Sequence, residues 1–260
     1  STANDTQLRN FTVDGAAKAT MTGVNIQNRG IAYKVRAVNC TTTGLNSANT
    51  ADQWVQCSTA ACGTGVNGPG RFIACEVPTS TTRGFDDNST AATYERCISY
   101  ANTGGTNDGF MMQAVWSGCW NCVAYGNGRD GFRSQAGGSV CVNCISEANG
   151  GWGYNMVASP MNLFLCAAFN NTSGASSLTN NTGLNVGFVT GTATFFTSGG
   201  GGDFSLNTTS GGGALARAAG IPGAYPSAAT TGYLDIGAAQ HADPTDTDRA
   251  AALVNGGLVR

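Results

Sequence analysis

The sequence predicts an all-β fold, a parallel β-helix of about ten coils, because its cysteines repeat at a fixed spacing. The step from Cys75 to Cys97 has the same length as the step from Cys122 to Cys144. The step from Cys97 to Cys122 is longer, because three extra residues precede Asp108. A repeat of about 22 residues with insertions at one place is typical of a solenoid whose coils stack on one another.

The segments between the cysteines favour strands. Each apolar run has three to six residues and is bounded by Gly, Asn, Ser or Thr, which leaves no room for helices of ordinary length. Cysteine is a small side chain of the buried type, so a column of cysteines suits the narrow interior of such a coil. We therefore expect the cysteines to lie in the core.

An Asn five places after the Cys and a Gly-aromatic pair further on complete the repeat. Asn tolerates the left-handed backbone of a tight corner, and stacked Asn side chains can hydrogen-bond from coil to coil. Gly before the aromatic residue is expected to suit a similar corner. The asparagines are Asn102, Asn127, Asn149 and Asn171, and the pairs are Gly84-Phe85, Gly109-Phe110, Gly131-Phe132 and Gly153-Tyr154.

The coils before and after this regular stretch are looser. Upstream, we expect Cys57 and Cys40 to extend the cysteine column, with Val13 as its first member. Downstream, a longer insertion after Cys166 makes Phe196 the expected next member. The first coil starts without a preceding amphipathic helix to cover it, and an uncovered coil is an open sheet edge. We therefore expect an N-terminal domain or a partner chain to cap it.

The last residues differ from the repeat. The run TDTDRAAALVNGGLVR contains helix-capping residues, helix formers and an Asn-Gly stop, which predicts a short helix at residues 248–254. We expect residues 1–240 to form the parallel β-helix and residues 241–260 a C-terminal extension.

The segments NCVAYGNGRDGF and NCISEANGGWGY, with the ending FSLNTTSGGGALARAAG and YLDIGAAQ, resemble the right-handed parallel β-helix or pectate-lyase-like superfamily. The resemblance covers about residues 6–240 and implies a right-handed, single-stranded parallel β-helix. It also implies that a strand at residues 235–238 seals the end. The superfamily includes polysaccharide lyases, glycosidases, epimerases, phage tailspikes and adhesins. The chain lacks the paired Asp motifs, the His-containing loop and the Arg-x-Lys signature of the pectin-cleaving members.

The composition argues against nucleic acid and membrane as partners. Charged residues make up 11% of the chain and the net charge is −2, so no basic stripe or polybasic patch is present. No apolar run approaches the roughly 18 residues of a membrane span. No signal peptide is visible and the first residue is Ser1, so we expect either a removed leader or a segment of a longer protein.

The spacing C-x2-C-x18-C-x2-C from Cys119 to Cys144 matches a four-thiolate zinc site. Tyr94 and Leu163 continue the column of its first and third cysteines, however, and residues three apart on a strand tend to point to opposite faces. A ladder of reduced thiols is therefore the favoured interpretation. Cys57 and Cys62 lie outside the regular spacing and form the pair for which a disulfide is the alternative.

Asp108 and Asp130 are the candidate catalytic residues if the chain is an enzyme. Both precede a Gly-Phe pair and are expected to stack on adjacent coils, about 5 Å apart. One carboxyl would then have a raised pKa, or a cation such as Ca²⁺ would bind between them, and such a spacing approaches that of a retaining glycosidase. The alternative is turn chemistry, with each side chain bound to the local backbone. The single histidine, His241, follows the predicted coils, which excludes a Ser-His-Asp device within them.

Aromatic residues predict carbohydrate binding. Tyr100 and Tyr125 share a column, and Trp152 is expected beside Asp130. Exposed aromatic side chains on a β-helix can stack on sugar rings. Trp116 is expected in the core or in a groove wall.

Two hypotheses for the function follow. The favoured one is a structural or host-attachment component of a phage tail fibre, spike or adhesin, at a virion or other extracellular surface. It would form a homo-oligomer, with a trimer favoured, and contact surface polysaccharide. The alternative is a polysaccharide lyase or glycoside hydrolase that acts in a lateral groove around Asp108 and Asp130. Apart from Ca²⁺ in that alternative, no cofactor or metal is expected.

Overall fold

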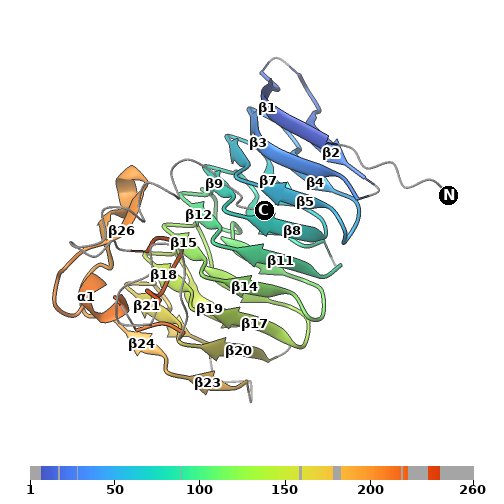
Figure 1. Ribbon diagram of the computed structural model, residues 1–260. Coiled ribbons are helices and arrows are strands. Elements are labelled where there is room, and N and C mark those ends of the chain that lie inside the picture. Colours follow the sequence, from blue (N-terminus) through green and yellow to red (C-terminus); the bar gives the residue numbers. More distant parts are fainter. Residues whose placement is uncertain are drawn as a thin grey trace, which may run out of the picture.

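A computed structural model describes residues 7–16, 18–27, 29–88, 90–157, 160–177, 183–217, 219–221 and 234–240. The predicted helix at residues 248–254 and the predicted extension lie outside this part of the chain. The described residues form a stack of parallel coils, from β1 at one end to β23 at the other (Figure 1). None of their helices is long and apolar enough to cross a membrane.

Each coil contributes strands to three parallel rows. β1 (Gln7–Asp14) pairs with β3 (Ile31–Val38), and β3 pairs with the first strand of both the first and the second row. The first row consists of β5 (Gln53–Val55), β8 (Gly70–Ile73), β11 (Ala92–Glu95), β14 (Gly118–Trp120), β17 (Ser139–Val142), β20 (Met161–Phe164) and β23 (Asn185–Val186). The second row consists of β6 (Ser58–Ala60), β9 (Glu76–Pro78), β12 (Ile98–Tyr100), β15 (Val123–Tyr125), β18 (Ile145–Glu147), β21 (Ala167–Phe169) and β24 (Val189–Thr190).

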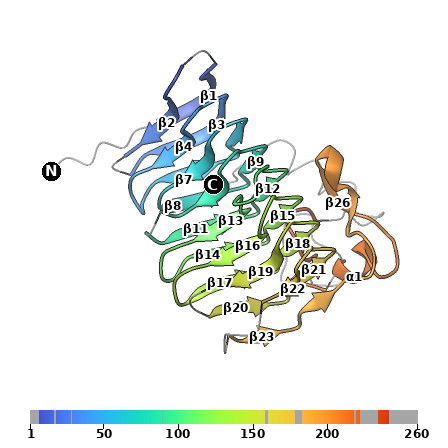
Figure 2. The same ribbon diagram turned by 180° about the vertical axis from the view of Figure 1, so that it is seen from behind.

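The third row lies on the other side of the stack (Figure 2). It consists of β2 (Thr22–Ile26), β4 (Thr43–Ser47), β7 (Thr64–Asn67), β10 (Arg83–Asp86), β13 (Phe110–Met112), β16 (Phe132–Ser134), β19 (Trp152–Met156) and β22 (Gly174–Ser176). The predicted parallel β-helix is therefore confirmed.

The strand registers place one inward column at the corner between the first and second rows. Its members are Phe11, Val35, Cys57, Cys75, Cys97, Cys122, Cys144, Cys166 and Phe188. The column spans about eight turns rather than the expected ten. Val13 and Phe196, expected at its two ends, lie outside it, because Phe11 and Phe188 take those places.

Cys40 belongs to a second inward column, at the corner between the second and third rows. This column continues through Cys62, Ser80, Asn102, Asn127, Asn149 and Asn171. Cys40 therefore does not extend the column of Cys57, and Cys57 and Cys62 lie in different columns. All ten thiols are free and buried.

A single residue in the left-handed conformation makes the turn between the first and second rows. Its φ is +52° at Arg96, +53° at Asn121 and +59° at Asn143. This residue interrupts the alternation of side chains, so Cys119 before it and Cys122 after it both point inward and are buried. The expectation of opposite faces is wrong for this reason. Within the described ranges, no three His, Cys, Asp or Glu side chains are arranged to hold a metal ion.

The cysteine column has a physical reason beyond size. Each thiol donates a weak hydrogen bond to a backbone carbonyl of the preceding coil, at 3.3 Å from Cys75 Sγ to Trp54 O and from Cys97 Sγ to Phe72 O. Burial raises the pKa of Cys75, Cys97 and Cys166 far above the ordinary value. These cysteines are core residues and not nucleophiles.

The asparagines form the predicted ladder. Asn102 Nδ2 donates to Asn127 Oδ1 at 2.6 Å, Asn127 Nδ2 to Asn149 Oδ1 at 2.9 Å, and Asn149 Nδ2 to Asn171 Oδ1 at 2.8 Å. The left-handed residue of this corner is the one before each Asn, for example Ala148 with φ +59°. The Asn side chains thus fill the interior, and their neighbours make the turn.

The Gly-aromatic pairs supply the opposite wall of the core. Their rings stack from coil to coil, with centroids 4.7 Å apart for Phe85 and Phe110 and 4.8 Å apart for Phe110 and Phe132. The expected corner role of the glycines is wrong. A Cβ at Gly131 would collide with the side chain of Ser146 and come within 2.9 Å of Asn149 Nδ2. The glycines are therefore needed for the space that the asparagine ladder occupies.

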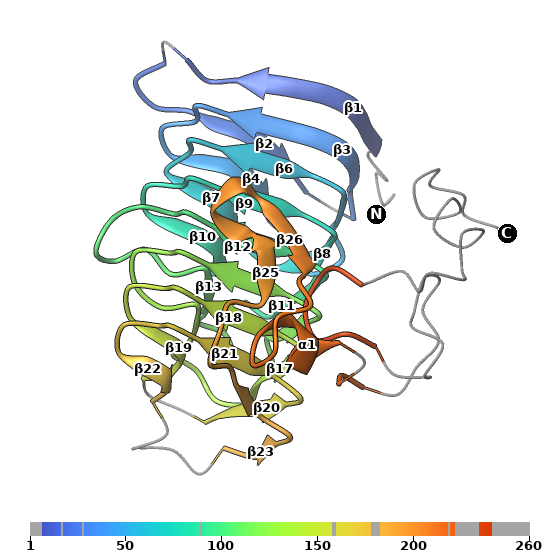
Figure 3. The ribbon, with the colours of Figure 1, turned by 90° about the vertical axis from the view of Figure 1, so that its left-hand side faces the viewer.

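The chain then folds back over the outer face of the second row (Figure 3). An antiparallel hairpin of β25 (Phe196–Ser198), η2 (Gly199–Gly201) and β26 (Asp203–Leu206) is followed by α1 (Gly213–Ala216). Its apolar side chains pack on Val123 and Ile145. Residues 235–238 also lie against this face, with a hydrogen bond of 2.8 Å from Gly237 N to Asn143 O. They form no strand that seals the end, so that expectation is wrong.

Candidate functional site

Asp108 and Asp130 occupy neighbouring coils, directly before the Gly-Phe pairs of β13 and β16. The pairing of Phe110 with Phe132 places the two carboxylates in the same column. Both side chains are buried, and each accepts a backbone N–H of the next coil: 3.3 Å from Asp130 N to Asp108 Oδ1 and 2.8 Å from Trp152 N to Asp130 Oδ1. The predicted stacking is present, and each carboxylate also links one coil to the next.

Two arginines neutralise this pair. Arg129 binds Asp108 with two nitrogens, with 2.7 Å from Nε to Oδ1. Arg133 Nη1 lies 3.0 Å from Asp130 Oδ2, and Asn155 Nδ2 lies 2.7 Å from the same oxygen. The guanidinium groups thus supply the positive charge that a bound cation would otherwise provide.

The pKa of Asp108 is raised above its ordinary value, chiefly because the carboxyl is buried. Hydrogen bonding and charge from Arg129 act in the opposite direction, and the nearby Asp130 raises the pKa further. Burial therefore contributes more to the raised pKa of Asp108 than the neighbouring carboxylate does. A carboxylate that is buried, ion-paired and bonded to backbone is poorly placed to exchange protons with a substrate.

The predicted carbohydrate-binding aromatics are divided between two faces. Tyr100 and Tyr125 are stacked on the second row, as expected, and both lie against Phe204 of the hairpin, with ring centroids 5.0 Å and 5.7 Å away. The hairpin therefore half-buries them. Trp152 is half-buried on the third row, above Gly174. A role in carbohydrate binding stays a prediction for all three.

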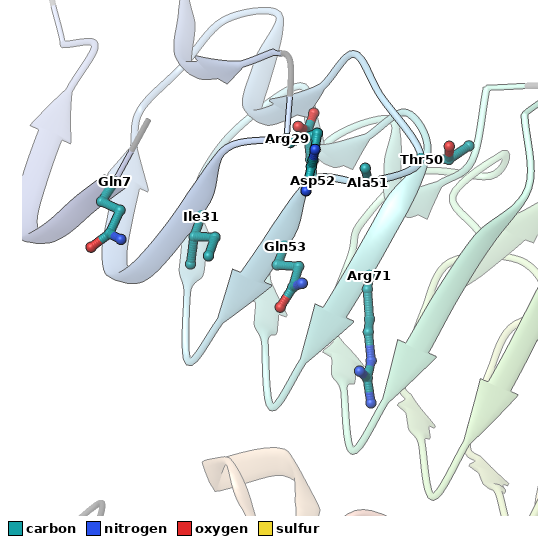
Figure 4. Close-up of a pocket in the computed structure, with 8 residues that line it drawn as sticks. All are labelled: Gln7, Arg29, Ile31, Thr50, Ala51, Asp52, Gln53 and Arg71. Atoms are coloured by element: carbon teal, nitrogen blue, oxygen red, sulfur yellow. The ribbon is translucent and has the colours of Figure 1, made fainter. Parts of the chain in front are cut away.

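A groove that the sequence did not reveal crosses the first coils, at the edge of the first row. Its volume is about 380 Å³, and its lining residues are Gln7, Arg29, Ile31, Thr50, Ala51, Asp52, Gln53 and Arg71. Figure 4 shows Gln7, Ile31, Gln53 and Arg71 on successive strands, with Arg29 and Asp52 at the corner. The registers confirm that these four residues form one column across β1, β3, β5 and β8.

The groove presents polar side chains on a rigid base. Gln53 and Arg71 are exposed, as is Arg29. Arg71 also forms an ion pair with Glu95, with 2.7 Å from Nη2 to Oε1. Asp52 is buried and accepts hydrogen bonds of 3.0 Å from Gly30 N, Ser47 Oγ and Asn49 N, so it anchors the corner and is not available to a ligand. The exposed polar groups are the amides of Gln7 and Gln53, the guanidinium groups of Arg29 and Arg71 and the hydroxyl of Thr50, which are well suited to bind hydroxyl and carboxylate oxygens.

The column of the groove could not be read from the sequence. Its members are unevenly spaced, because the first coils differ in length: the step from Gln7 to Ile31 is the longest and that from Gln53 to Arg71 is the shortest. The regular spacing that aligned the later coils therefore gives no alignment here.

Comparison with known proteins shows similarity at the level of the fold. No protein-family model and no curated protein matches the chain. Among solved structures, the crystal structure of pectate lyase Pel9A is similar, with a TM-score of 0.60 and 18% identity over 89% of this chain and 73% of that chain. The chain has the pectate-lyase-like, right-handed β-helix fold. The plasmid-mediated fluoroquinolone resistance protein QnrB1 also matches, with a TM-score of 0.30 and 12% identity over 70% of this chain and 91% of that chain. That score is too low to support a structural argument.

Proposed function

We propose that this pectate-lyase-like chain is a polysaccharide-binding component of a virion or other extracellular surface, of the tail-fibre, spike or adhesin kind. The observation that carries the proposal is the contrast between two sites. The groove at Gln53 and Arg71 is open and lined by exposed polar groups, whereas Asp108 and Asp130 are buried in ion pairs. The first arrangement suits ligand binding, and the second suits stability.

The direction of the groove fits an extended glycan. Gln7, Gln53 and Arg71 lie on strands that are about 4.8 Å from their neighbours, so polar groups recur along the axis of the solenoid. A polysaccharide laid along this axis would present successive sugar units to successive coils. Side-chain amides and guanidinium groups would bind its hydroxyl groups.

Replacement of both Gln53 and Arg71 by Ala is expected to weaken polysaccharide binding at least about tenfold, because the central donors of the groove are removed. A glycan array selects the ligand, and titration calorimetry measures its affinity for both forms. Arg36→Ala is the matched control, since Arg36 is an exposed arginine on β3 that does not line the groove. Unchanged affinity in the double variant would contradict the proposed groove.

A polysaccharide lyase or glycosidase is the second candidate, and one observation favours it: the raised pKa of Asp108 beside Asp130. The same purified chain is incubated with bacterial polysaccharides, whose length is followed by size-exclusion chromatography. Shortening that Asp108→Asn abolishes would replace the first candidate with this one. A chain that binds a glycan without shortening it supports the first.

We also propose that the chain forms a homotrimer through the outer face of β14, β17 and β20, the part of the first row that lies beyond the groove. This part carries a column of half-exposed apolar side chains: Trp120, Val142 and Phe164. From β12 to β24, the corresponding face of the second row is already covered by the segment that contains the hairpin and α1. We further propose that the first coil, which contains β1 and β2, is capped by another domain or by a partner chain that continues its sheets.

Light scattering is expected to give a native mass three times the chain mass of 26.4 kDa. Val142→Arg is expected to reduce it to that of one chain, because a charge would be buried in the interface. Val140→Arg, on the same strand but outside the apolar column, is the comparison. If its native mass equals that of one chain, the interface extends to Val140, and if its native mass equals that of three chains, the interface does not. A stable wild-type monomer would contradict the proposed trimer.

A further inference from the structure

Trp116 lies on the loop of residues 113–117, between β13 and β14, and is far more exposed than expected. Trp116 is 77% exposed and the neighbouring Val115 is 55% exposed, so the expected place in the core is wrong. The backbone of Trp116 has a φ of +68°, in the left-handed region that bulky residues rarely adopt. Such a conformation persists where the surrounding structure imposes it.

The loop that carries Trp116 is held firmly on both sides. The buried carboxylate of Asp87 accepts hydrogen bonds from the backbone of Gln113 at 2.8 Å and from that of Ala114 at 3.1 Å. On the other side of Trp116, the hydroxyl of Ser117 donates to the same carboxylate at 2.5 Å. The exposure of the ring therefore belongs to a fixed loop.

The next coil supports the indole ring from one side. A Cβ at Gly138 would lie 2.9 Å from Cε3, 3.1 Å from Cζ3 and 3.2 Å from Cδ2 of Trp116. These similar distances place the backbone of Gly138 against the flat of the ring. In addition, Trp116 N donates to Gly137 O at 3.4 Å. One face of the indole is thus packed, and the large exposed fraction belongs to the rest of the ring.

We propose that Trp116 is a stacking platform for a pyranose ring of the bound polysaccharide, at a second contact point outside the groove. The inference rests on the proposed function and adds a subsite to it. The flat indole face suits the apolar C–H face of a sugar ring, and the fixed loop lowers the entropy lost on binding. Gln135 is exposed on the segment that also carries Gly138, and its amide can bind sugar hydroxyls.

The size of the apolar surface distinguishes a sugar from a protein as the occupant. Among the described residues of this loop and of the loops stacked on it in the next two coils, the exposed large apolar side chains are Val115, Trp116 and Val157. A stable protein interface needs about 800 Å² from each partner, which three side chains cannot supply. A single sugar ring needs no more than one aromatic platform with hydrogen-bonding groups beside it.

Trp116→Ala is expected to weaken binding at least about tenfold, and Trp116→Tyr to retain most of the affinity, because a smaller ring still stacks. The probes are dextran, polygalacturonate, chitin oligosaccharides and capsular polysaccharides, titrated by calorimetry against the full chain. Binding is also expected to shield part of the tryptophan emission from iodide, and this shielding should be absent in Trp116→Ala. Val115→Ala, on the same loop, is the matched control with unchanged affinity.

The outcomes separate the platform from the groove. If Trp116→Ala keeps wild-type affinity while the Gln53 and Arg71 variant loses it, the platform is refuted and the proposed function stands. If the wild-type chain binds none of the probes, both are overturned. If Trp116→Ala changes the native mass and leaves affinity unchanged, the ring is a contact between chains and the platform is again refuted.

Discussion

Asn149→Leu is expected to lower the free energy of unfolding by about 3–5 kcal/mol, because it breaks the interior ladder on both sides. Asn149 is fully buried and accepts hydrogen bonds from Asn127 N at 3.0 Å and Asn127 Nδ2 at 2.9 Å. It also donates to Asn171 Oδ1 at 2.8 Å. Leucine has a similar size but no polar atoms, so the groups of both neighbouring asparagines would be left without this partner inside the core.

Urea unfolding followed by circular dichroism measures this loss. Asn46→Leu is the matched control, because Asn46 belongs to an outward ladder with Asn25 and Asn67, joined by hydrogen bonds of 3.0 Å and 2.9 Å. Water can replace these bonds, so the control is expected to cost less than about 1 kcal/mol. Equal losses in the two variants would show that burial is not the cause.

Arg129→Leu is expected to cost about 3–5 kcal/mol near neutral pH, because it removes the guanidinium group that hydrogen-bonds to the buried Asp108 carboxylate and leaves only Arg133 Nε, 4.0 Å from Oδ2, as its ion-pair partner. The pKa of Asp108 is already raised by burial, and the loss of Arg129, which lowers it, would raise it further. A carboxyl whose pKa is higher in the folded than in the unfolded chain stabilises the native state at pH values below the pKa of the unfolded chain. This stabilisation is lost as the pH rises through the pKa of the folded chain. The destabilisation should therefore be small near about pH 4 and largest near about pH 7.

Unfolding experiments across this pH range test the sign. The double variant Arg129→Leu with Asp108→Asn is expected to recover much of the stability at neutral pH, because the amide carries no charge. It should also lose the pH dependence of the single variant. A loss in Arg129→Leu that is the same at both ends of the range would contradict the buried charge as its cause.

The regular coils could be predicted because residues at the same place in successive coils contact one another. A repeat in the sequence therefore indicates which residues are in contact. Cys122, Cys144 and Cys166, at one spacing, therefore located a column of the core. The first coils could not be aligned in this way, since the step from Cys57 to Cys75 is shorter than the regular one. Cys40 and Cys62 are 22 residues apart, which is the regular spacing, so the period could have placed them in one column; the prediction joined Cys40 to Cys57 instead.

The sequence also predicted that Asp108 and Asp130 stack, but not how they are neutralised. Residues at equal places in successive coils must stack, whereas the reach of Arg129 across to the preceding coil depends on its side-chain conformation. The fold-back of the hairpin was missed because Phe196 and Phe204 pack on residues far away in the chain, with no repeat to signal the contact. The exposure of Trp116 depends on how one loop turns, which the spacing of the coils does not determine.

The hairpin changes how force would pass through the rod. In a simple solenoid each coil holds only its neighbours, so coils can detach one at a time from an end. Here Phe204 packs on both Tyr100 and Tyr125, which belong to β12 and β15. Glu147 of β18 accepts a hydrogen bond of 3.0 Å from Phe195 N, at the start of the hairpin. The hairpin thus joins three coils. A pull along the axis of the stack would act on these three coils together, and the coils near β1, which the hairpin does not contact, would separate first. The coils of β12, β15 and β18 are therefore expected to resist such a pull as one unit, and the coils of β6 and β9 to resist it separately.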